Sequence, residues 1–196
     1  MLDVYKIRKD FPILGKKVNN TDLIYFDNAA TSQTPNQVID VISSYYKENN
    51  SNIHRGLHSL SADATNKYEN SRSIIKNHFG AAHDHEIIFT SGTTHGINII
   101  SSGLEKLISS KDELIVSEME HHSNIVPWQM LCEKTGSKLK VIPINDDGTL
   151  DMDEYKSLLT NQVKFVFINH VSNTLGIVNP IKEIVDLAHK NKSCLL

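Results

Sequence analysis

The segment TSGTTHG at residues 90–96 is the sharpest candidate for chemistry in the sequence. It follows a short apolar run at residues 87–89 and precedes a stretch with helical spacing. Glycine allows a tight turn and the close approach of a ligand, and free N–H groups at the start of a helix attract anions. With the hydroxyl groups of Thr93 and Thr94, the segment could therefore bind a phosphate. An ordinary strand-to-helix turn with a threonine cap explains the same residues.

A pair of histidines, His121 and His122, follows the next apolar run at residues 114–116. Neighbours on a helix point about 100° apart, so these two rings cannot easily share one metal ion. A flat imidazole at the end of a strand suits stacking on an aromatic ligand or moving a proton. A loop that caps a helix and leaves both histidines in solvent accounts for the pair equally well.

A third polar segment, residues 169–176, follows the long apolar run at residues 163–168. Its short side chains, among them Asn173, could hydrogen-bond a hydroxyl or carboxylate group of a ligand. They could equally cap the turn themselves, because asparagine and serine commonly do so. The segment YFDNAAT at residues 25–31 contains Ala29, and its small side chains either admit a substrate closely or permit tight packing.

The segment HRGLH at residues 54–58 offers Arg55 as a cation for an anionic substrate. His54 and His58 also have the i,i+4 spacing of a zinc-binding pair. Gly56 between them weakens a helix, however, and no third ligand is evident in the sequence. We therefore expect no metal site.

Apolar runs rich in β-branched residues alternate along the chain with longer segments of helical spacing. We predict strands at the runs 87–90, 114–116, 139–142, 163–168 and 194–196. We predict helices at 36–46, 63–79, 94–108, 123–135, 152–159 and 181–190, preceded by a short helix and a turn at 18–20. Strands that alternate with helices in this way run parallel, which predicts an α/β fold, a three-layer sandwich. Ligands bind where such strands end and helices begin, and the three polar segments each follow a predicted strand.

The composition is that of a globular protein, with 39% hydrophobic and 22% charged residues. The formal net charge of −3 and the lack of a Lys/Arg run give no reason to expect nucleic acid or a membrane as partner. No apolar stretch approaches the ~20 residues of a membrane span, and the charged N-terminus lacks the apolar region of a secretory signal. Two isolated cysteines, Cys132 and Cys194, suit a reducing compartment, so we expect a cytoplasmic protein.

Six segments together resemble the class V aminotransferase-like cysteine desulfurases, specifically the Suf-type group that is similar to selenocysteine lyases. They are YFDNAAT (25–31), HRGLH (54–58), SGTT (91–94), MEHHSNIVPWQ (119–129), PINDDGTL (143–150) and HVSNTLG (170–176). The resemblance runs from about Tyr5 to the last residue, and the run EHHSNIVPWQ is highly specific. It matches the N-terminal half of the family's chain.

The resemblance implies a partial large domain of the type I pyridoxal-phosphate-dependent transferase fold at residues 21–196, with an N-terminal arm at residues 1–20. It also implies pyridoxal 5'-phosphate as the cofactor. The residues that it assigns to the cofactor are Thr93 and Thr94 at the phosphate, His121 on the pyridine ring and Asn173 at the phenolic oxygen. His121 is also the implied catalytic acid or base, and the residues implied to lie near the substrate are Ala29, His54 and Arg55.

The family's reaction takes sulfur from L-cysteine and leaves L-alanine and an enzyme persulfide. The persulfide sulfur then passes to a sulfur-acceptor protein of the Suf system, for iron–sulfur cluster assembly. The resemblance further implies a homodimer.

In the family, four catalytic groups follow the region that this sequence matches. They are an aspartate on the pyridine nitrogen, the lysine that binds the cofactor covalently, a nucleophilic cysteine and an arginine for the substrate carboxylate. Neither Cys132 nor Cys194 matches the nucleophile, and His95 stands where relatives often carry an acidic residue. We therefore expect the chain by itself to be inactive and marginally stable, or to need a chain that carries the C-terminal half. The alternatives are a non-catalytic remnant, a binding or heterodimerising module, or an unrelated phosphate-binding α/β domain.

Overall fold

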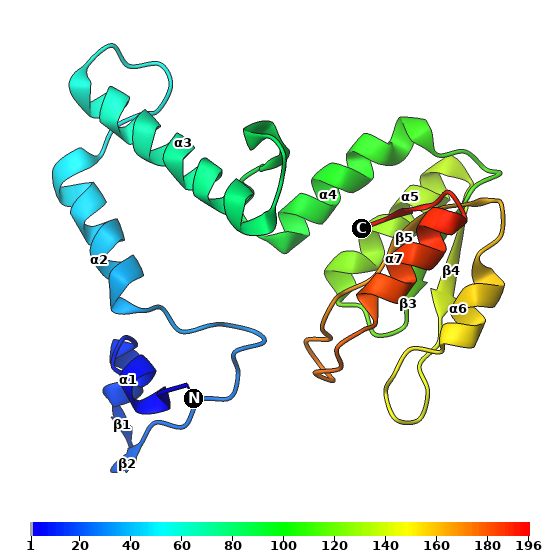
Figure 1. Cartoon of the computed structure of the whole chain (residues 1–196), viewed down its shortest axis with the longest axis horizontal. Coiled ribbons are helices and arrows are strands. Elements are labelled where there is room, and N and C mark those ends of the chain that lie inside the picture. Colours follow the sequence, from blue (N-terminus) through cyan, green and yellow to red (C-terminus); the bar gives the residue numbers. More distant parts are fainter. Residues whose placement is uncertain (1) are drawn as a thin grey trace. The chain divides into compact units, whose positions relative to one another are not determined.

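The computed structural model describes residues 2–196, and Figure 1 labels the helices and strands along the chain. The chain divides into two units, the first ending at Phe89 and the second running from Thr90 to Leu196. Met1, the first residue of the arm predicted at residues 1–20, lies outside the described residues. The division into this arm and a domain at residues 21–196 stays a prediction.

The second unit is built on a four-stranded parallel sheet. Its strands are β3 (Glu113–Ser117), β4 (Lys138–Ile142), β5 (Val163–Phe167) and β6 (Cys194–Leu195), in the order β4-β3-β5-β6. β3 therefore lies between β4 and β5, and Leu114 pairs with Leu139 on one side and with Phe165 on the other. Each of these strands overlaps a run predicted as a strand, which confirms the parallel α/β prediction.

Helices cover both faces of this sheet (Figure 1). They are α4 (Thr93–Leu104), α5 (Val126–Thr135), α6 (Met152–Leu158) and α7 (Ile181–Lys190), with the short turns η4 (Glu105–Leu107) and η5 (His122–Asn124). Because side chains alternate along a strand, Ile115 of β3 packs into the apolar cluster with α6 and α7. Its neighbours Leu114 and Val116 pack into the other cluster, with α4 and α5. The predicted three-layer sandwich is thus confirmed.

Specific contacts hold these layers together. The ring of Trp128 in α5 stacks on Phe167 of β5, with centroids 3.6 Å apart and planes inclined by 10°. On the opposite face, the hydroxyl of Tyr155 in α6 donates to the carbonyl of Ile184 in α7 at 3.0 Å. Burial raises the pKa of Tyr155 to about 12, so this hydroxyl stays protonated as a donor. The helices are therefore fixed against the strands whose ends carry the polar segments.

The first unit consists of one long helix and several short elements, joined by loops. They are α1 (Val4–Arg8), η1 (Pro12–Gly15), β1 (Lys17–Val18), β2 (Thr21–Asp22), α2 (Asn36–Ser44), η2 (Tyr45–Asn49), α3 (Ser59–Phe79) and η3 (Asp84–Glu86). β1 and β2 form a hairpin whose central residues, Asn19 and Asn20, have φ of 52° and 63°, as this two-residue turn requires. The turn predicted at 18–20 is confirmed. α3 is long but polar, and no helix within residues 2–196 has the length and apolar character to cross a membrane.

Few side chains of the first unit are buried. Within residues 2–89, only Ser61 and Ala64 are buried. The apolar side of α2 is open, with Val41 68% and Ile42 52% exposed. Helical stability comes mostly from packing an apolar side, so α2 gains little from its surroundings.

The strand predicted at residues 87–90 is wrong. Ile87 has extended backbone angles (φ −98°, ψ 114°), but residues 87–90 pair with no strand in the part of the chain that the structure describes. Ile88 is 73% exposed, and the carbonyl of Ile87 accepts a hydrogen bond from the guanidinium of Arg72 instead. A strand depends on pairing with residues that are distant in sequence, and β-branched composition alone does not supply that pairing.

We expect amide hydrogen exchange to divide the chain along these lines. The amides of β3 and β5 are paired on both sides and covered on both faces, so they should exchange only when the sheet opens. The amides of α2 should exchange at least roughly a hundredfold faster, because little apolar area protects the helix. Exchange followed by mass spectrometry measures both. Equal protection of α2 and β3 would contradict this expectation.

Candidate functional site

The start of α4 is open and carries no side-chain cap. Its N-cap residue, Gly92, has φ of 142°, which favours glycine, and a Cβ added there would meet no atom within 4 Å. Thr93 and Thr94 form the first turn, and both side chains are exposed. The first N–H groups of a helix lack intrahelical partners and attract anions, so this turn suits a phosphate group.

His121 follows β3, and its imidazole is exposed. Its Nδ1 atom accepts a hydrogen bond from the backbone N–H of Ser123 at 3.1 Å and lies 2.8 Å from Ser123 Oγ. A backbone N–H can only donate, so Nδ1 is the acceptor and the neutral ring carries its proton on Nε2. The ring therefore caps η5 through one nitrogen and keeps the other nitrogen for a ligand.

Asn173 lies in the loop between β5 and α7. The loop is closed by a bridge between Val171 and Val178 and by a hydrogen bond from the N–H of Ser172 to the carbonyl of Ile177 at 3.0 Å. The side chain of Asn173 is exposed and makes none of the hydrogen bonds found within residues 2–196. Its amide is thus available to a ligand.

The segments that carry these residues are connected in the second unit. β3 and β5 are neighbouring parallel strands, so the loops with His121 and Asn173 leave the same edge of the sheet. Asn169 joins the two loops, because its N–H donates to Glu120 Oε1 at 2.8 Å and its Nδ2 to the carbonyl of Met119 at 3.2 Å. α4 contacts η5, the turn that His121 caps. The four residues predicted at the cofactor make no hydrogen bond to one another within residues 2–196, so only a shared ligand would link them directly.

The residues predicted near the substrate lie in the first unit. Ala29 is exposed in a turn. His54 has φ of 70°, its N–H donates to Thr65 Oγ1 at 2.9 Å, and its Nε2 lies 3.2 Å from Glu69 Oε1. Arg55, the next residue, is exposed. The role of Ala29, His54 and Arg55 at a substrate stays a prediction.

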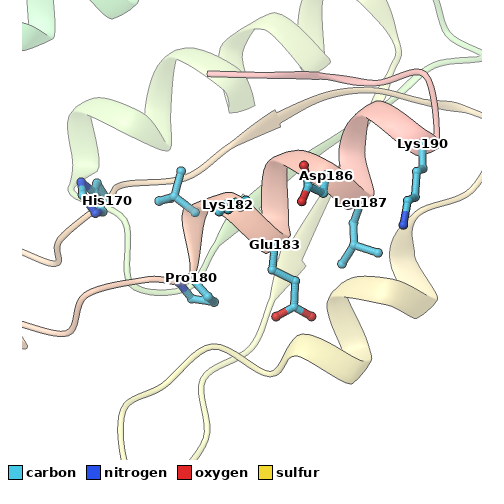
Figure 2. Close-up of a pocket in the computed structure, with 8 residues that line it drawn as sticks. His170, Pro180, Lys182, Glu183, Asp186, Leu187 and Lys190 are labelled. Atoms are coloured by element: carbon cyan, nitrogen blue, oxygen red, sulfur yellow. The ribbon is translucent and has the colours of Figure 1, made fainter. Parts of the chain in front are cut away.

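A separate hollow of about 670 Å³ lies along α7 (Figure 2). It is lined by His170, Pro180, Ile181, Lys182, Glu183, Asp186, Leu187 and Lys190. Glu183 Oε1 lies 3.6 Å from Lys156 Nζ of α6, so one of the charged groups that line the hollow is already paired. The two carboxylates and two lysines of the lining balance in charge, and the four residues predicted at the cofactor do not line it. We assign no ligand to this hollow.

Residues 24–196 match the aminotransferase class-V family. The chain belongs to this family. It is 41% identical over its full length to a probable cysteine desulfurase of Halalkalibacterium halodurans and covers 48% of that protein. Over 96% of its length it is 44% identical to a cysteine desulfurase of Synechococcus elongatus, of which it covers 30%.

Solved structures support the same relationship for this class-V chain. The apo structure of the cysteine desulfurase from Thermococcus onnurineus NA1 matches the whole chain with a TM-score of 0.90 at 36% identity, and 47% of that protein is covered. The cysteine desulfurase CsdA of Escherichia coli matches with a TM-score of 0.84 at 27% identity, again over the whole chain and 48% of that protein. The class-V chain thus spans about half the length of most of these relatives.

His95 holds the loop before α4, a role that the sequence did not reveal. Its Nδ1 accepts a hydrogen bond from the N–H of Ser91 at 3.2 Å and lies 3.0 Å from Ser91 Oγ. An acidic side chain at this position could accept the same N–H. The signal available in the sequence was the i,i+4 spacing of Ser91 and His95.

Glu69 and Arg72 of α3 were also missed. Arg72 Nε donates to Glu69 Oε2 at 3.0 Å, and its guanidinium carbon lies 5.2 Å from the ring centre of Tyr68 and 5.0 Å from that of Phe89. The hydrogen bond to Glu69 raises the pKa of Arg72, so the cation persists at any ordinary pH. Because Glu69 also contacts His54, one carboxylate orients both the cation and the predicted substrate histidine. The i,i+3 spacing of Glu69 and Arg72 is the signal that could have found them.

Replacing His95 with alanine should free the loop before α4. The N–H of Ser91 loses its acceptor, so its amide should exchange roughly fivefold faster, since one hydrogen bond contributes about 1 kcal/mol net. Exchange followed by nuclear magnetic resonance measures this, with His189→Ala on the exposed side of α7 as the matched control. An unchanged Ser91 amide in the His95→Ala variant would show that the imidazole does not hold the loop.

The two cysteines of the class-V chain should react at very different rates. Cys194 is exposed in β6, whereas Cys132 is buried in α5, and burial raises the pKa of its thiol. Because the thiolate is the reactive form, a thiol reagent should modify Cys194 in the folded chain and Cys132 only after unfolding. A disulfide-reagent titration before and after adding guanidinium counts the reactive thiols. Rapid reaction of both thiols in the folded chain would refute the difference.

Proposed function

We propose that the chain forms the pyridoxal 5'-phosphate-binding part of a cysteine desulfurase. The observation that carries the proposal is the linkage of three structures in one unit: the open start of α4, the loop of His121 and the loop of Asn173. The cofactor has an anionic phosphate, a flat ring and a phenolic oxygen, and each needs a different partner. The named function of the relatives supports the same proposal.

The start of α4 fits the phosphate group. Gly92 leaves open space where a side chain would otherwise stand, so the group can approach the backbone closely. Thr93 and Thr94 would add their hydroxyl groups to the unpaired N–H groups of the first turn. The positive end of the helix dipole stabilises an anion at this position.

His121 and Asn173 fit the ring and its oxygen. When bound, pyridoxal phosphate supplies an electron sink for bond cleavage in the substrate. His121 would stack on the ring in the orientation that Ser123 gives it, and its Nε2 would hold or move a proton. The amide of Asn173 would donate a hydrogen bond to the phenolic oxygen.

The substrate and the partners are part of the same proposal. L-cysteine would be the sulfur donor, with Ala29, His54 and Arg55 near it, and L-alanine the product. The sulfur would pass to an acceptor protein of the Suf system for iron–sulfur cluster assembly, and the working unit would be a homodimer. The chain spans about half the length of the relatives it matches, so their activity belongs to longer proteins. The substrate, the acceptor and the homodimer therefore rest on the resemblance.

A second candidate is a heterodimerising module, which the exposed apolar side chains of the first unit favour. Phe26 is 93% exposed and Leu57 is fully exposed, in addition to the open side of α2. Apolar side chains gathered at a surface often mark a face that another polypeptide covers. Sedimentation of the purified chain, alone and mixed with a chain that carries the C-terminal half of a desulfurase, discriminates this candidate, because a folded monomer that the mixture leaves unchanged would argue against it.

Titration with pyridoxamine 5'-phosphate tests the cofactor site. This compound keeps the ring and the phosphate but lacks the aldehyde, so it does not label surface lysines. Thr94→Val removes a hydroxyl that would contact a charged phosphate, and it should weaken binding roughly tenfold or more. Quenching of the ligand's fluorescence measures the affinity.

Ser102→Ala, at an exposed position further along α4, is the matched control and should bind as the unmodified chain does. Pyridoxamine without its phosphate should bind the unmodified chain and the Thr94→Val variant equally weakly. No saturable binding to the unmodified chain would sink the proposal. Equal losses in Thr94→Val and Ser102→Ala would remove the start of α4 as the phosphate site.

A further inference from the structure

Glu120 is a buried carboxylate directly before His121. It is 8% exposed, and donors from three segments contact it. Ser117 Oγ donates to its Oε1 at 2.6 Å, the N–H of Asn169 donates to Oε1 at 2.8 Å, and Asn124 Nδ2 donates to Oε2 at 2.7 Å. None of the ion pairs within residues 2–196 includes Glu120. The carboxylate is thus held by neutral donors from the end of β3, the end of β5 and η5.

The indole of Trp128 decides which way these hydrogen bonds run. An indole N–H can only donate, and Trp128 Nε1 lies 2.9 Å from Asn124 Oδ1, so this atom is the amide oxygen. The NH₂ group of Asn124 then points at Glu120, which has to accept on both oxygens. A glutamine at position 120 would set one NH₂ group against another. Rotating the new amide at position 120 by 180° would set its NH₂ group against the N–H of Asn169. Rotating the Asn124 amide instead would set its NH₂ group against the indole N–H of Trp128.

This network fixes the backbone on both sides of His121. Glu120 precedes the histidine and Asn124 follows it by three residues. Between them lies Ser123, whose N–H orients the imidazole through Nδ1. We propose that Glu120 is a positioning residue for His121, which fixes the tautomer and the orientation of the imidazole without touching the ligand. The assignment rests on the proposed cofactor site, in which His121 is the ring partner.

Moving the carboxylate from one side chain to the other tests this assignment. Glu120→Gln alone opposes two NH₂ groups, and Asn124→Asp alone opposes two carboxylates. In the E120Q/N124D variant, the amide at position 120 donates to the carboxylate at position 124, which still accepts from Trp128. Ser117 and Asn169 still meet an oxygen at position 120, and the net charge is unchanged. The two mismatches should therefore cancel.

Two nuclear magnetic resonance signals report the network without any cofactor. The chain has one tryptophan, so the indole N–H of Trp128 gives a single resonance, and His121→Gln identifies the His121 signals among ten histidines. Each single variant should speed indole N–H exchange roughly tenfold or more and shift the His121 ring to a mixture of tautomers. The double variant should return the exchange rate of the indole N–H to within about threefold of that in the unmodified chain. It should also return the His121 ring to a single tautomer.

Two controls separate positioning from a general loss of stability. Glu133→Gln makes the same change at an exposed position of α5 and should leave both signals unchanged. Tyr155→Phe removes the hydrogen bond to Ile184 on the other face of the sheet, so it lowers stability without touching the network. The assignment is overturned if Tyr155→Phe alters the His121 ring as much as Glu120→Gln does. It is also overturned if Glu120→Gln leaves the ring unchanged, or if the double variant is no better than the single ones.

Titrating the same variants with pyridoxamine 5'-phosphate separates this assignment from the cofactor proposal. If Glu120→Gln binds the compound more weakly and E120Q/N124D restores the affinity, the result supports both the cofactor site and the positioning role of Glu120. If the unmodified chain binds no ligand while the two signals change as expected, the cofactor site fails and the positioning of His121 stands. Unchanged affinity in Glu120→Gln would overturn the role of Glu120 at the proposed site.

Discussion

Complete burial of β3 is the constraint on which the second unit depends. All five of its residues are buried, so the polar groups at both ends of the strand need partners inside the protein. At the first end, burial alone would raise the pKa of Glu113, but hydrogen bonds from Lys140 and Thr160 outweigh it and lower the pKa. At the last end, Ser117 donates to Glu120. A carboxylate thus anchors each end of the strand, and the second carboxylate adjoins the loop that carries the candidate site.

Much of the second unit could be predicted from sequence, because its signals are local. α7 spans residues 181–190 as predicted, and its buried residues Ile184 and Ala188 have the i,i+4 spacing of a helix that covers a sheet. The run at 87–90 has the composition of a strand yet forms none, since pairing depends on distant residues. For α2 the spacing shows an apolar side, but whether another element covers that side is equally non-local, and Val41 remains exposed. Local pattern therefore predicts an element's type better than its burial.

The residue types of the site could be read from the sequence, but the contacts that fix them could not. For His121 the sequence left two interpretations open, a helix cap and a ligand partner. The structure shows that they are compatible, because Nδ1 accepts the capping N–H while the rest of the ring stays exposed. His58 and His95 also accept a backbone N–H through Nδ1. No sequence pattern shows which ring nitrogen of a histidine accepts a hydrogen bond. Glu120 belongs to the motif MEHHSNIVPWQ, but the motif does not show that its carboxylate is buried or which residues contact it.

The polar network around Glu120 ends at one unsatisfied atom, for a structural reason. Asn179 is 3% exposed, and its Nδ2 lies 2.9 Å from both the carbonyl oxygen and Oδ1 of Asn169. Turning this amide over would oppose oxygen atoms, so Asn179 Oδ1 keeps no partner within residues 2–196. Such an atom costs about 1–3 kcal/mol. Yet Asn179 also closes the loop that carries Asn173, because its N–H donates to the carbonyl of His170 at 2.9 Å. The loop that carries Asn173 is thus fixed by contacts of Asn179 whose geometry leaves this one oxygen unpaired.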